Sequence, residues 1–367
     1  MGHTATSINH KLRTAPIPAR QPDQATVTVV IPCYNYSQYL KQAVESCLKQ
    51  DAVAVDVIIV DDASTDDSLQ VAQQLSRDHS NITVLSHSSN KGMVDTFNDG
   101  ARTATGEFLV RLDADDLLTP GSLSRATDLA RAYPSVGLIY GHPVHFSSNQ
   151  PPKFRENASS WTIWPGLEWL TERCRFPHNV ITSPEVLLRR SVVEQVGYQA
   201  PLRHTPDMEM WFRMSGFADV AYIHGADQAW HRDHPDSMSA NEVDELVDMR
   251  ERLEAFEVLF AGPVGAIPQA ALLKETAAQS FLVEALDAAG HELDRGAGAT
   301  ELFNFCIGLV EELGPSTAQC ETLRKLKARA QTDASLPWAR PAALWRRALG
   351  RAKSEMRVAH WHRNGVY

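Results

Sequence analysis

Short apolar runs alternate with amphipathic segments through the first third of the chain. The runs are rich in β-branched residues and predict buried strands, while the segments between them carry apolar residues at helical spacing. The predicted strands cover residues 26–32, 55–60, 81–85 and 108–112, and the predicted helices cover 38–50, 69–75 and 94–103. This alternation favours an α/β fold with a doubly wound, mostly parallel sheet.

Acidic residues follow the fourth predicted strand. Asp113, Asp115 and Asp116 stand within four positions of one another, where their carboxylates would repel. A divalent cation such as Mg²⁺ or Mn²⁺ would relieve that repulsion, because hard cations take oxygen ligands. The alternative is a solvated acidic turn in which Asp115 or Asp116 caps the next helix. The residues alone do not rank the three acids as metal ligands.

Polar residues also follow the first two strands. Pro32, Tyr34 and Asn35 follow the first, and Asp61 and Asp62 follow the second. Ligands of doubly wound sheets bind beyond the carboxyl ends of the strands. The fold is therefore expected to gather these residues with the acids of the fourth strand, although the sequence separates them.

Four blocks of sequence carry a family resemblance. Over residues 26–235 their order and spacing resemble the large family 2 of inverting, nucleotide-sugar-dependent glycosyltransferases with the GT-A fold. The blocks are Val29–Asn35, Ile58–Asp66, Asn90–Gly92 and Leu112–Asp116.

The resemblance implies a donor site. It places the nucleotide at Pro32, Tyr34, Asn35, Asp61, Asp62, Lys91 and Asp113, with the base contact at Asp62, and the metal at Asp113, Asp115, Asp116 and His234. From the residues alone, Asp61 and Asp62 could instead cap a helix with Ser64 and Thr65, and Tyr34 could be a core aromatic. His234 could equally be a structural loop histidine.

One departure from the family pattern is Phe97, which stands where the family often has an arginine. Lys91 and Arg111 are candidate substitutes, unless they are ordinary surface or strand-edge residues.

The resemblance also implies a general base at Asp207. The family usually has Glu-Asp here, but Pro206 replaces the glutamate. Asp207 could instead only stabilise a helix start together with Glu209. Glu209 is the reserve base, and Trp211 and Arg232 are auxiliary candidates. The aromatic residues of this half favour a core role over sugar stacking; they are Phe154, Trp161, Trp164, Trp169 and Phe176.

The pattern becomes helical after residue 240. We expect helices over 243–259, 268–289, 299–313 and 316–331, followed by a basic, tryptophan-containing tail. The predicted organisation is a flexible segment 1–25, a GT-A domain 26–240 (26–140 for the nucleotide, 141–240 for the acceptor), a C-terminal helical appendage 241–336 and the tail 337–367. The tail suits an anionic membrane surface, or docking on the acidic catalytic domain.

Charge and cysteine content narrow the class of protein. The 367 residues carry a formal net charge of −10, which argues against general nucleic-acid binding. The five cysteines form no CxxC pair and suggest reduced thiols. Residues 1–25 have no apolar core typical of a signal peptide, so we expect a cytoplasmic protein, with the tail as its one candidate contact to the inner membrane face.

The sequence therefore predicts transfer of a sugar from a nucleotide-sugar donor, with a UDP-sugar favoured, to a carbohydrate, lipid-linked or small-molecule acceptor. Mn²⁺ or Mg²⁺ is the expected cofactor. Two alternatives are a non-catalytic glycosyltransferase-like binding protein and a sugar nucleotidyltransferase. The second would need a glycine- and lysine-rich phosphate loop after the first strand, which residues 32–36 do not form.

Overall fold

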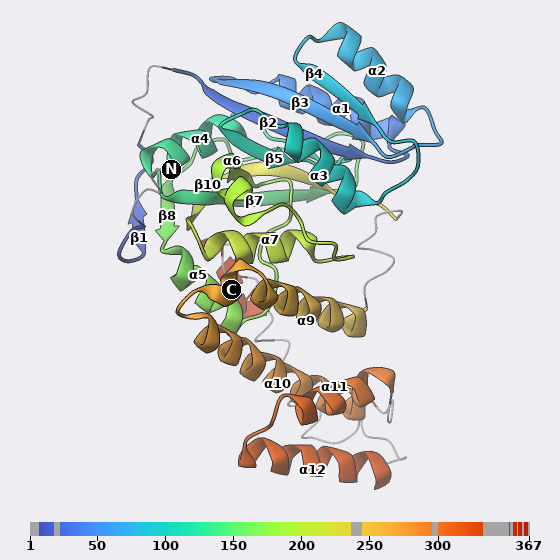
Figure 1. Ribbon diagram of the computed structural model, residues 1–367, viewed down its shortest axis with the longest axis vertical. Coiled ribbons are helices and arrows are strands. Elements are labelled where there is room, and N and C mark those ends of the chain that lie inside the picture. Colours follow the sequence, from blue (N-terminus) through green and yellow to red (C-terminus); the bar gives the residue numbers. More distant parts are fainter. Residues whose placement is uncertain are drawn as a thin grey trace.

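The structure is a computed structural model that describes residues 7–17, 23–235, 244–295 and 300–332, and ten residues between 352 and 365. One mixed sheet runs through the upper part of the molecule, and helices extend below it (Figure 1). Its strand order is β1-β8-β10-β7-β9-β5-β2-β3-β4, with β6 paired to β10. The strands are β1 (Leu12–Thr14), β2 (Ala25–Cys33), β3 (Val53–Asp61), β4 (Ile82–Ser86), β5 (Phe108–Arg111), β6 (Leu117–Leu118), β7 (Val136–Phe146), β8 (Ser160–Trp164), β9 (Leu187–Arg189) and β10 (Asp219–Arg232).

Helices cover both faces of the sheet. They are α1 (Ser37–Leu48), α2 (Ser68–Asp78), α3 (Met93–Thr103), α4 (Ser122–Ala132), α5 (Gly166–Arg175), α6 (Arg190–Val196) and α7 (Pro206–Ser215). After them come α9 (Glu245–Ala261), the short 3-10 helix η1 (Pro263–Ala266), α10 (Ala270–Arg295), α11 (Glu301–Glu312) and α12 (Thr317–Thr332). The predicted α/β class with a C-terminal helical region is confirmed.

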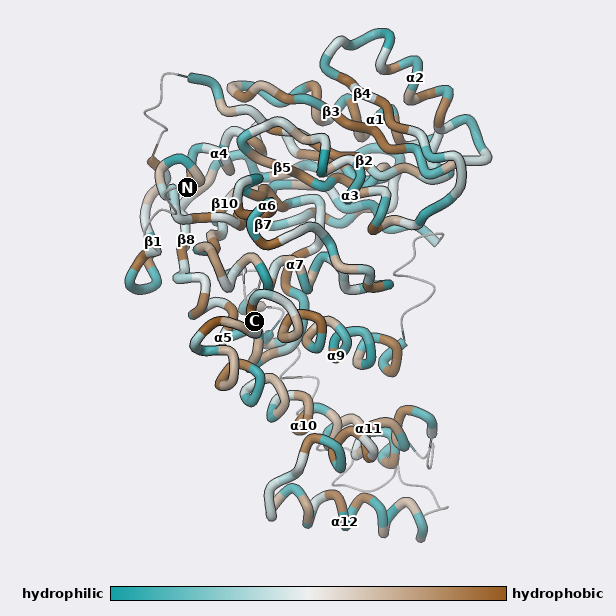
Figure 2. The backbone as a smooth tube through the Cα atoms, in the orientation of Figure 1, coloured by the Kyte–Doolittle hydropathy of each residue, from teal (hydrophilic) through white to brown (hydrophobic). Residues whose placement is uncertain are grey.

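The central strands are apolar on both faces because each face is covered. Val29 of β2 packs in a cluster with residues of α1, α2 and α4, while Val30 packs with residues of α3, α5 and α7. Strands β5, β2, β3 and β4 are mutually parallel, so their carboxyl ends lie at one edge. Hydrophobic colour follows these strands, whereas α9 and α12 alternate between the two colours (Figure 2). The predicted parallel sheet is thus present, and antiparallel β9 joins it to the second half.

The N-terminal segment departs from the expected flexible one. Strand β1 pairs antiparallel with β8, and the backbone N–H of Ile8 donates to Asp219 over 2.9 Å. Leu12–Thr14 therefore extends the sheet, and Ile8 is tied to its neighbouring strand β10. The short run of three strand residues carries too little apolar pattern to be recognised in the sequence.

The C-terminal helices divide into two groups. Helix α9 belongs to the main core, where Phe256 meets Phe212 of α7 at a ring-centroid distance of 5.4 Å. The distal part of α10 forms a separate core with α11 and α12, centred on residues such as Leu282 and Phe303. No helix among the described residues is long and apolar enough to cross a membrane.

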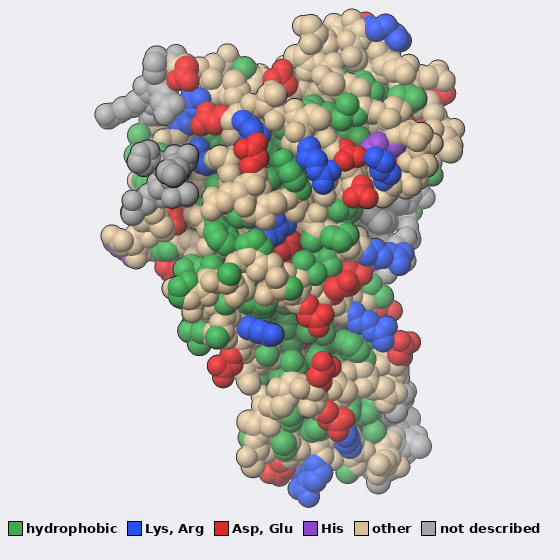
Figure 3. All heavy atoms as spheres, in the orientation of Figure 1, with side chains coloured by type: hydrophobic (Ala, Val, Ile, Leu, Met, Phe, Trp, Pro, Cys, Tyr) green, Lys and Arg blue, Asp and Glu red, His purple; other side chains and the backbone are tan. Residues whose placement is uncertain are grey.

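Most of the basic tail lies outside the described residues. The described part docks on the α/β domain: the indole N–H of Trp361 donates to the carbonyl of Val180 over 2.8 Å. The hydroxyl of Tyr140 donates to the carbonyl of Gly365 over 2.8 Å. These contacts agree with docking, and membrane contact stays a prediction. On the face shown in Figure 3, basic and acidic side chains are interspersed.

Candidate active site

The turn after β2 is tied to the turn after β3. Asn35 adopts a left-handed backbone conformation, with φ of 60°. Its side-chain oxygen accepts hydrogen bonds from the backbone N–H groups of Thr65 and Asp66, at 2.8 and 3.3 Å. Pro32 is buried within β2, whereas Tyr34 is 43% exposed. Tyr34 is therefore accessible for stacking on a ligand, and Asn35 shapes the loop that presents it.

Asp62 holds the loop that precedes α3. Its carboxylate accepts from the backbone N–H groups of Lys91 and Gly92, at 2.8 and 2.9 Å, and lies 2.7 Å from Nδ1 of His87. Burial opposes ionisation, but these hydrogen bonds outweigh it and lower the pKa of Asp62 below its ordinary value. Both oxygens are thus engaged within the fold. The Lys91 side chain pairs with Asp99 at the surface, over 2.9 Å.

Asp61 differs from its neighbour. It is 1% exposed, and its Oδ2 accepts from the backbone N–H of Ser64 over 3.2 Å. Its Oδ1 is buried and has no hydrogen-bond partner among the described residues. A buried acceptor without a partner costs free energy. Oδ1 of Asp61 could therefore accept a hydrogen bond from a ligand, whereas both oxygens of Asp62 already accept hydrogen bonds within the protein.

Arg111 lies inside the acidic cluster. Its guanidinium donates to Oδ1 of Asp113 from Nε and Nη2, at 3.1 and 2.8 Å. It also lies over the ring of Phe97, 5.9 Å from the centroid. Phe97, which replaces the family's frequent arginine, thus supports a cation that comes from β5 instead. The side chain of Asp113 is 32% exposed and remains accessible.

Asp115 meets His234. Nε2 of His234 lies 2.8 Å from Oδ2 of Asp115, and its ring packs against Tyr36 and Tyr39. Burial, with the negative charges of Asp116 and Asp113, raises the pKa of Asp115 to about 6. A cation beside this carboxylate would offset all three effects. The carboxylate and imidazole donors fit a divalent metal such as Mn²⁺, so these two residues suit the ligand role that the sequence predicts.

Asp116 has a different setting. It is fully buried; its Oδ1 accepts from the backbone N–H of Arg232 over 2.8 Å, and its Oδ2 lies 3.0 Å from Nδ1 of His231. Burial raises the pKa of Asp116 and lowers that of His231. The bond between them and the carboxylate charge nevertheless raise the pKa of His231 to about 9. This geometry favours a supporting role for Asp116 over direct metal ligation.

Arg232 is enclosed by the fold. Its guanidinium donates to the carbonyl of Asp115 over 2.9 Å and to the side chain of Gln42 over 2.9 Å. It also lies between the rings of Tyr39 and Phe146, at 4.7 and 4.4 Å from their centroids. Arg232 therefore fixes the loop that carries Asp115.

Asp207 lies near the donor-side charges, although ninety residues separate them in the sequence. Its Oδ1 accepts from the backbone N–H of Met208 over 2.7 Å, and its Oδ2 accepts from Asn179 and Ser183, both at 3.3 Å. Burial raises the pKa of Asp207, while the positive charge of Arg111 opposes the rise and the negative charge of Asp113 adds to it. The charges of Arg111 and Asp113 at the end of β5 thus act on the pKa of Asp207.

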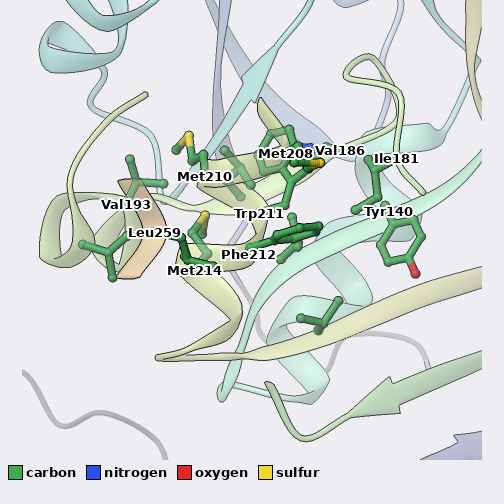
Figure 4. Close-up of a cluster of buried hydrophobic side chains, with 14 of the residues drawn as sticks. Tyr140, Ile181, Val186, Val193, Met208, Met210, Trp211, Phe212, Met214 and Leu259 are labelled. Atoms are coloured by element: carbon green, nitrogen blue, oxygen red, sulfur yellow. The ribbon is translucent and has the colours of Figure 1, made fainter. Parts of the chain in front are cut away.

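The other candidates on α7 point into the protein. Glu209 is 1% exposed and forms two hydrogen bonds with Arg213, at 2.9 and 2.8 Å. Trp211 is 1% exposed and packs among apolar side chains such as Phe212 and Met214 (Figure 4). The reserve role of Glu209 and the auxiliary role of Trp211 are therefore not supported. The helical period turns Glu209, two positions after Asp207, to a different face of α7, whereas Trp211, four positions after Asp207, lies on the same side of the helix but is enclosed by the core.

Glu185 was missed in the sequence. It is 4% exposed, and its carboxylate accepts from the backbone N–H and the hydroxyl of Thr182, at 2.7 and 2.8 Å. Burial raises the pKa of Glu185 to about 8. Ser183 and Asn179, which contact Asp207, belong to the same loop. No sequence motif marks these three residues, because their relation to Asp207 depends on burial and on contacts that only the fold creates.

Carboxylates gathered at the carboxyl ends of parallel strands occupy the edge at which open α/β sheets bind their ligands. Comparison with solved structures agrees. The structure of S. aureus TarS 1–349 with UDP-GlcNAc covers 83% of this chain and 88% of its own, with a TM-score of 0.59 and 15% identity. At that identity the likeness shows the fold, a GT-A arrangement.

Residues 28–197 match the model of glycosyl transferase family 2, and this part of the chain is a family 2 glycosyltransferase domain. An uncharacterised glycosyltransferase of Nostoc sp. is 32% identical over 178 residues, 46% of this chain and 52% of that protein. The chondroitin synthase of Escherichia coli is 31% identical over 156 residues, 40% of this chain and 23% of the synthase. The chain thus spans about half the length, or less, of these curated relatives.

Proposed function

We propose that this protein transfers a sugar from a nucleotide-diphosphate sugar to an acceptor hydroxyl or amine, with inversion at the anomeric carbon. The proposal rests on the Arg111–Asp113 and Asp115–His234 pairs at the end of β5, together with Asp207, a carboxylate whose pKa responds to the charges of Arg111 and Asp113. An inverting transfer needs a general base and a diphosphate site on opposite sides of one anomeric carbon, and we assign Asp207 to the first role and the residues after β5 to the second.

The donor side is formed by the ends of β2, β3 and β5. Tyr34 offers an exposed ring for the base, and Asp61 offers a buried carboxylate oxygen. Asp62 supports the same strand ends by holding the loop at Lys91 and Gly92. We favour a UDP-sugar, and the TarS structure of the same fold was solved with UDP-GlcNAc. Arg111 supplies a positive charge near the diphosphate.

A divalent cation would be held by Asp115 and His234, with Asp113 within the same acidic turn. When bound, it would neutralise charge on the departing diphosphate, which is Lewis-acid assistance to a leaving group. Arg232 fixes this turn through hydrogen bonds to the Asp116 carboxylate and to the carbonyl of Asp115.

Asp207 would act as the general base. The acceptor oxygen or nitrogen forms a bond to the anomeric carbon while the bond from that carbon to the diphosphate oxygen breaks. The acceptor proton passes to the Asp207 carboxylate. Its raised pKa suits this step, because a base works best when its pKa approaches the working pH. The acceptor would be a carbohydrate, a lipid-linked sugar or a small molecule.

A donor-hydrolysis assay tests the proposal. Purified protein is incubated with Mn²⁺ or Mg²⁺ and a panel of nucleotide sugars, and release of nucleoside diphosphate is measured. We expect slow metal-dependent release from one donor class, absent in Asp115→Asn. Nucleotide binding without release from any donor, with or without candidate acceptors, would favour the non-catalytic binding protein instead.

A further inference from the structure

We propose that His145, His231 and Asp233 form a second metal site, for a zinc-like transition-metal ion, which shares no ligand with the Asp115–His234 pair. A ligand atom from each of the three side chains lies within 4.8 Å of the other two. The site lies where β7 and β10 end, and neither the family match nor the relatives' names assign it a role.

The backbone builds this cluster. Strands β7 and β10 are parallel neighbours, and His231 stands opposite His145 in their register. Their rings lie 4.9 Å apart between centroids. Asp233 follows two positions later, so its side chain returns to the same face as His231. Its backbone N–H donates to the carbonyl of Phe146 over 2.8 Å, which continues the strand pairing past the end of β10.

Asp116 provides the support that a metal-bound histidine needs. Its Oδ2 lies 3.0 Å from Nδ1 of His231, so that nitrogen carries the proton of the hydrogen bond. The other ring nitrogen, Nε2, can then bind a cation that displaces its proton, as transition-metal ions do when a histidine ligates them. Metal-ligating histidines almost always donate their second N–H to a carboxylate or carbonyl, which fixes the ring and raises its basicity. Asp116 is itself fixed by the backbone N–H of Arg232.

The donor set indicates which ion would bind. Two imidazoles and one carboxylate are ligands that suit zinc and similar ions, rather than Mg²⁺, which prefers oxygen ligands. The side chains of His145 and Asp233 are 47% and 55% exposed, so an ion can reach the site and keep positions for water or a substrate oxygen. Three protein ligands with an open position are typical of accessible zinc sites.

The site is separate from the proposed donor metal, yet connected to it. His234 packs against Tyr36 and Tyr39, whereas His231 packs against His145. The two pairs are joined through the adjacent residues Asp115 and Asp116. An ion at His231 would therefore alter the charge that Asp116 places next to Asp115.

Cobalt titration tests the site directly. The full chain, stripped of metal with a chelator, is titrated with Co²⁺, and its visible d–d absorption is followed, then displaced with Zn²⁺. We expect absorption bands in the wild-type protein, lost in His145→Ala and Asp233→Asn. Loss of an outer-shell partner alone typically weakens metal binding by roughly 10- to 100-fold, so loss of His145 should weaken Zn²⁺ binding at least as much.

His234→Ala is the matched control, because it removes a histidine from the neighbouring pair and leaves the three proposed ligands. Co²⁺ held by Asp115 and His234 would contribute bands of its own, so this variant should lose only those; the bands that His145→Ala removes should remain and should be displaced by Zn²⁺ as in the wild type. Thermal unfolding without metal checks that every variant folds, which the exposure of His145 and Asp233 favours. The proposal is overturned if His145→Ala and Asp233→Asn keep the wild-type spectrum and affinity. It is also overturned if only His234→Ala loses them, or if the wild type gives no d–d bands. None of these readouts depends on sugar transfer.

Discussion

Substitution of Asp207 by asparagine separates the proposed base from a structural residue. Asparagine keeps the shape of the side chain and can still accept the hydrogen bond from the backbone N–H of Met208. Its amide group would replace Oδ2, which now accepts from Asn179 and Ser183 at 3.3 Å. Ser183 can rotate to accept, so we expect to lose about one net hydrogen bond, or ~0.5–1.5 kcal/mol of stability.

The catalytic loss should be much larger. Removing a general base typically costs roughly 10²- to 10⁴-fold in rate, which corresponds to about 3–5 kcal/mol of transition-state stabilisation. We expect that loss in sugar transfer with nearly unchanged affinity for the donor, because the proposed role of Asp207 is to contact the acceptor. Initial rates and calorimetric donor binding would be measured on the same preparation.

The pH profile adds a second test. Because burial raises the pKa of Asp207, wild-type transfer should decline, as pH falls, at a pH above the ordinary aspartate range. Asp207→Asn should lack that acid limb. Ser183→Ala is the matched control: it removes a hydrogen bond to Asp207 but keeps the carboxylate, so its rate should stay well above that of Asp207→Asn.

A normal rate in Asp207→Asn would refute the reasoning. Glu209→Gln tests the reserve base, but its result is ambiguous because Glu209 forms a buried ion pair with Arg213. Breaking one partner of a buried ion pair typically costs about 3–5 kcal/mol of stability. An inactive Glu209→Gln protein would therefore indicate a base only if its thermal unfolding were unchanged.

Three further predictions concern the surroundings of the site. Asp115→Asn should lower turnover by orders of magnitude because it removes a proposed metal ligand, yet raise the melting temperature in EDTA because it relieves carboxylate repulsion. Turnover and melting temperature equal to those of the wild type would contradict this prediction. Glu185 has its pKa raised from 4.5 to about 8, so its contribution to stability is fully present below 4.5 and is lost as pH rises through about 8. The melting temperature of the wild type should fall as pH rises through this range, and that of Glu185→Gln should fall less. The same fall in both proteins would contradict the role of Glu185. Trp361→Ala should cost about 1–3 kcal/mol of unfolding free energy and slow transfer, because Trp361 braces the loop at Val180 beside the Asp207 contacts. The exposed Met356→Ala should change neither, and an unaltered Trp361→Ala protein would show that the tail contact is dispensable.

The sequence by itself determined the α/β alternation and the acids at its strand ends. Hydrophobic periodicity is local, so the strand at 108–112 and the helices after 240 could be predicted without knowing their neighbours. The family blocks then named a domain that the family match confirms over residues 28–197. The donor-side and base candidates remain predictions, and the charge of Asp113 adds to the raised pKa of Asp207.

Only the tertiary structure decided what each polar side chain is paired with. Asp61 and Asp62 are adjacent and identical in type, yet one keeps an unpartnered oxygen and the other is saturated by the loop at Lys91. Asp207 and Glu209 both lie in the first turn of α7, but only Glu209 forms an ion pair with Arg213. The pairing of His145 with His231 depends on the register of β7 and β10, which lie far apart in the chain. Periodicity encodes which face of an element is buried, whereas partners, burial and pKa arise from contacts between distant segments.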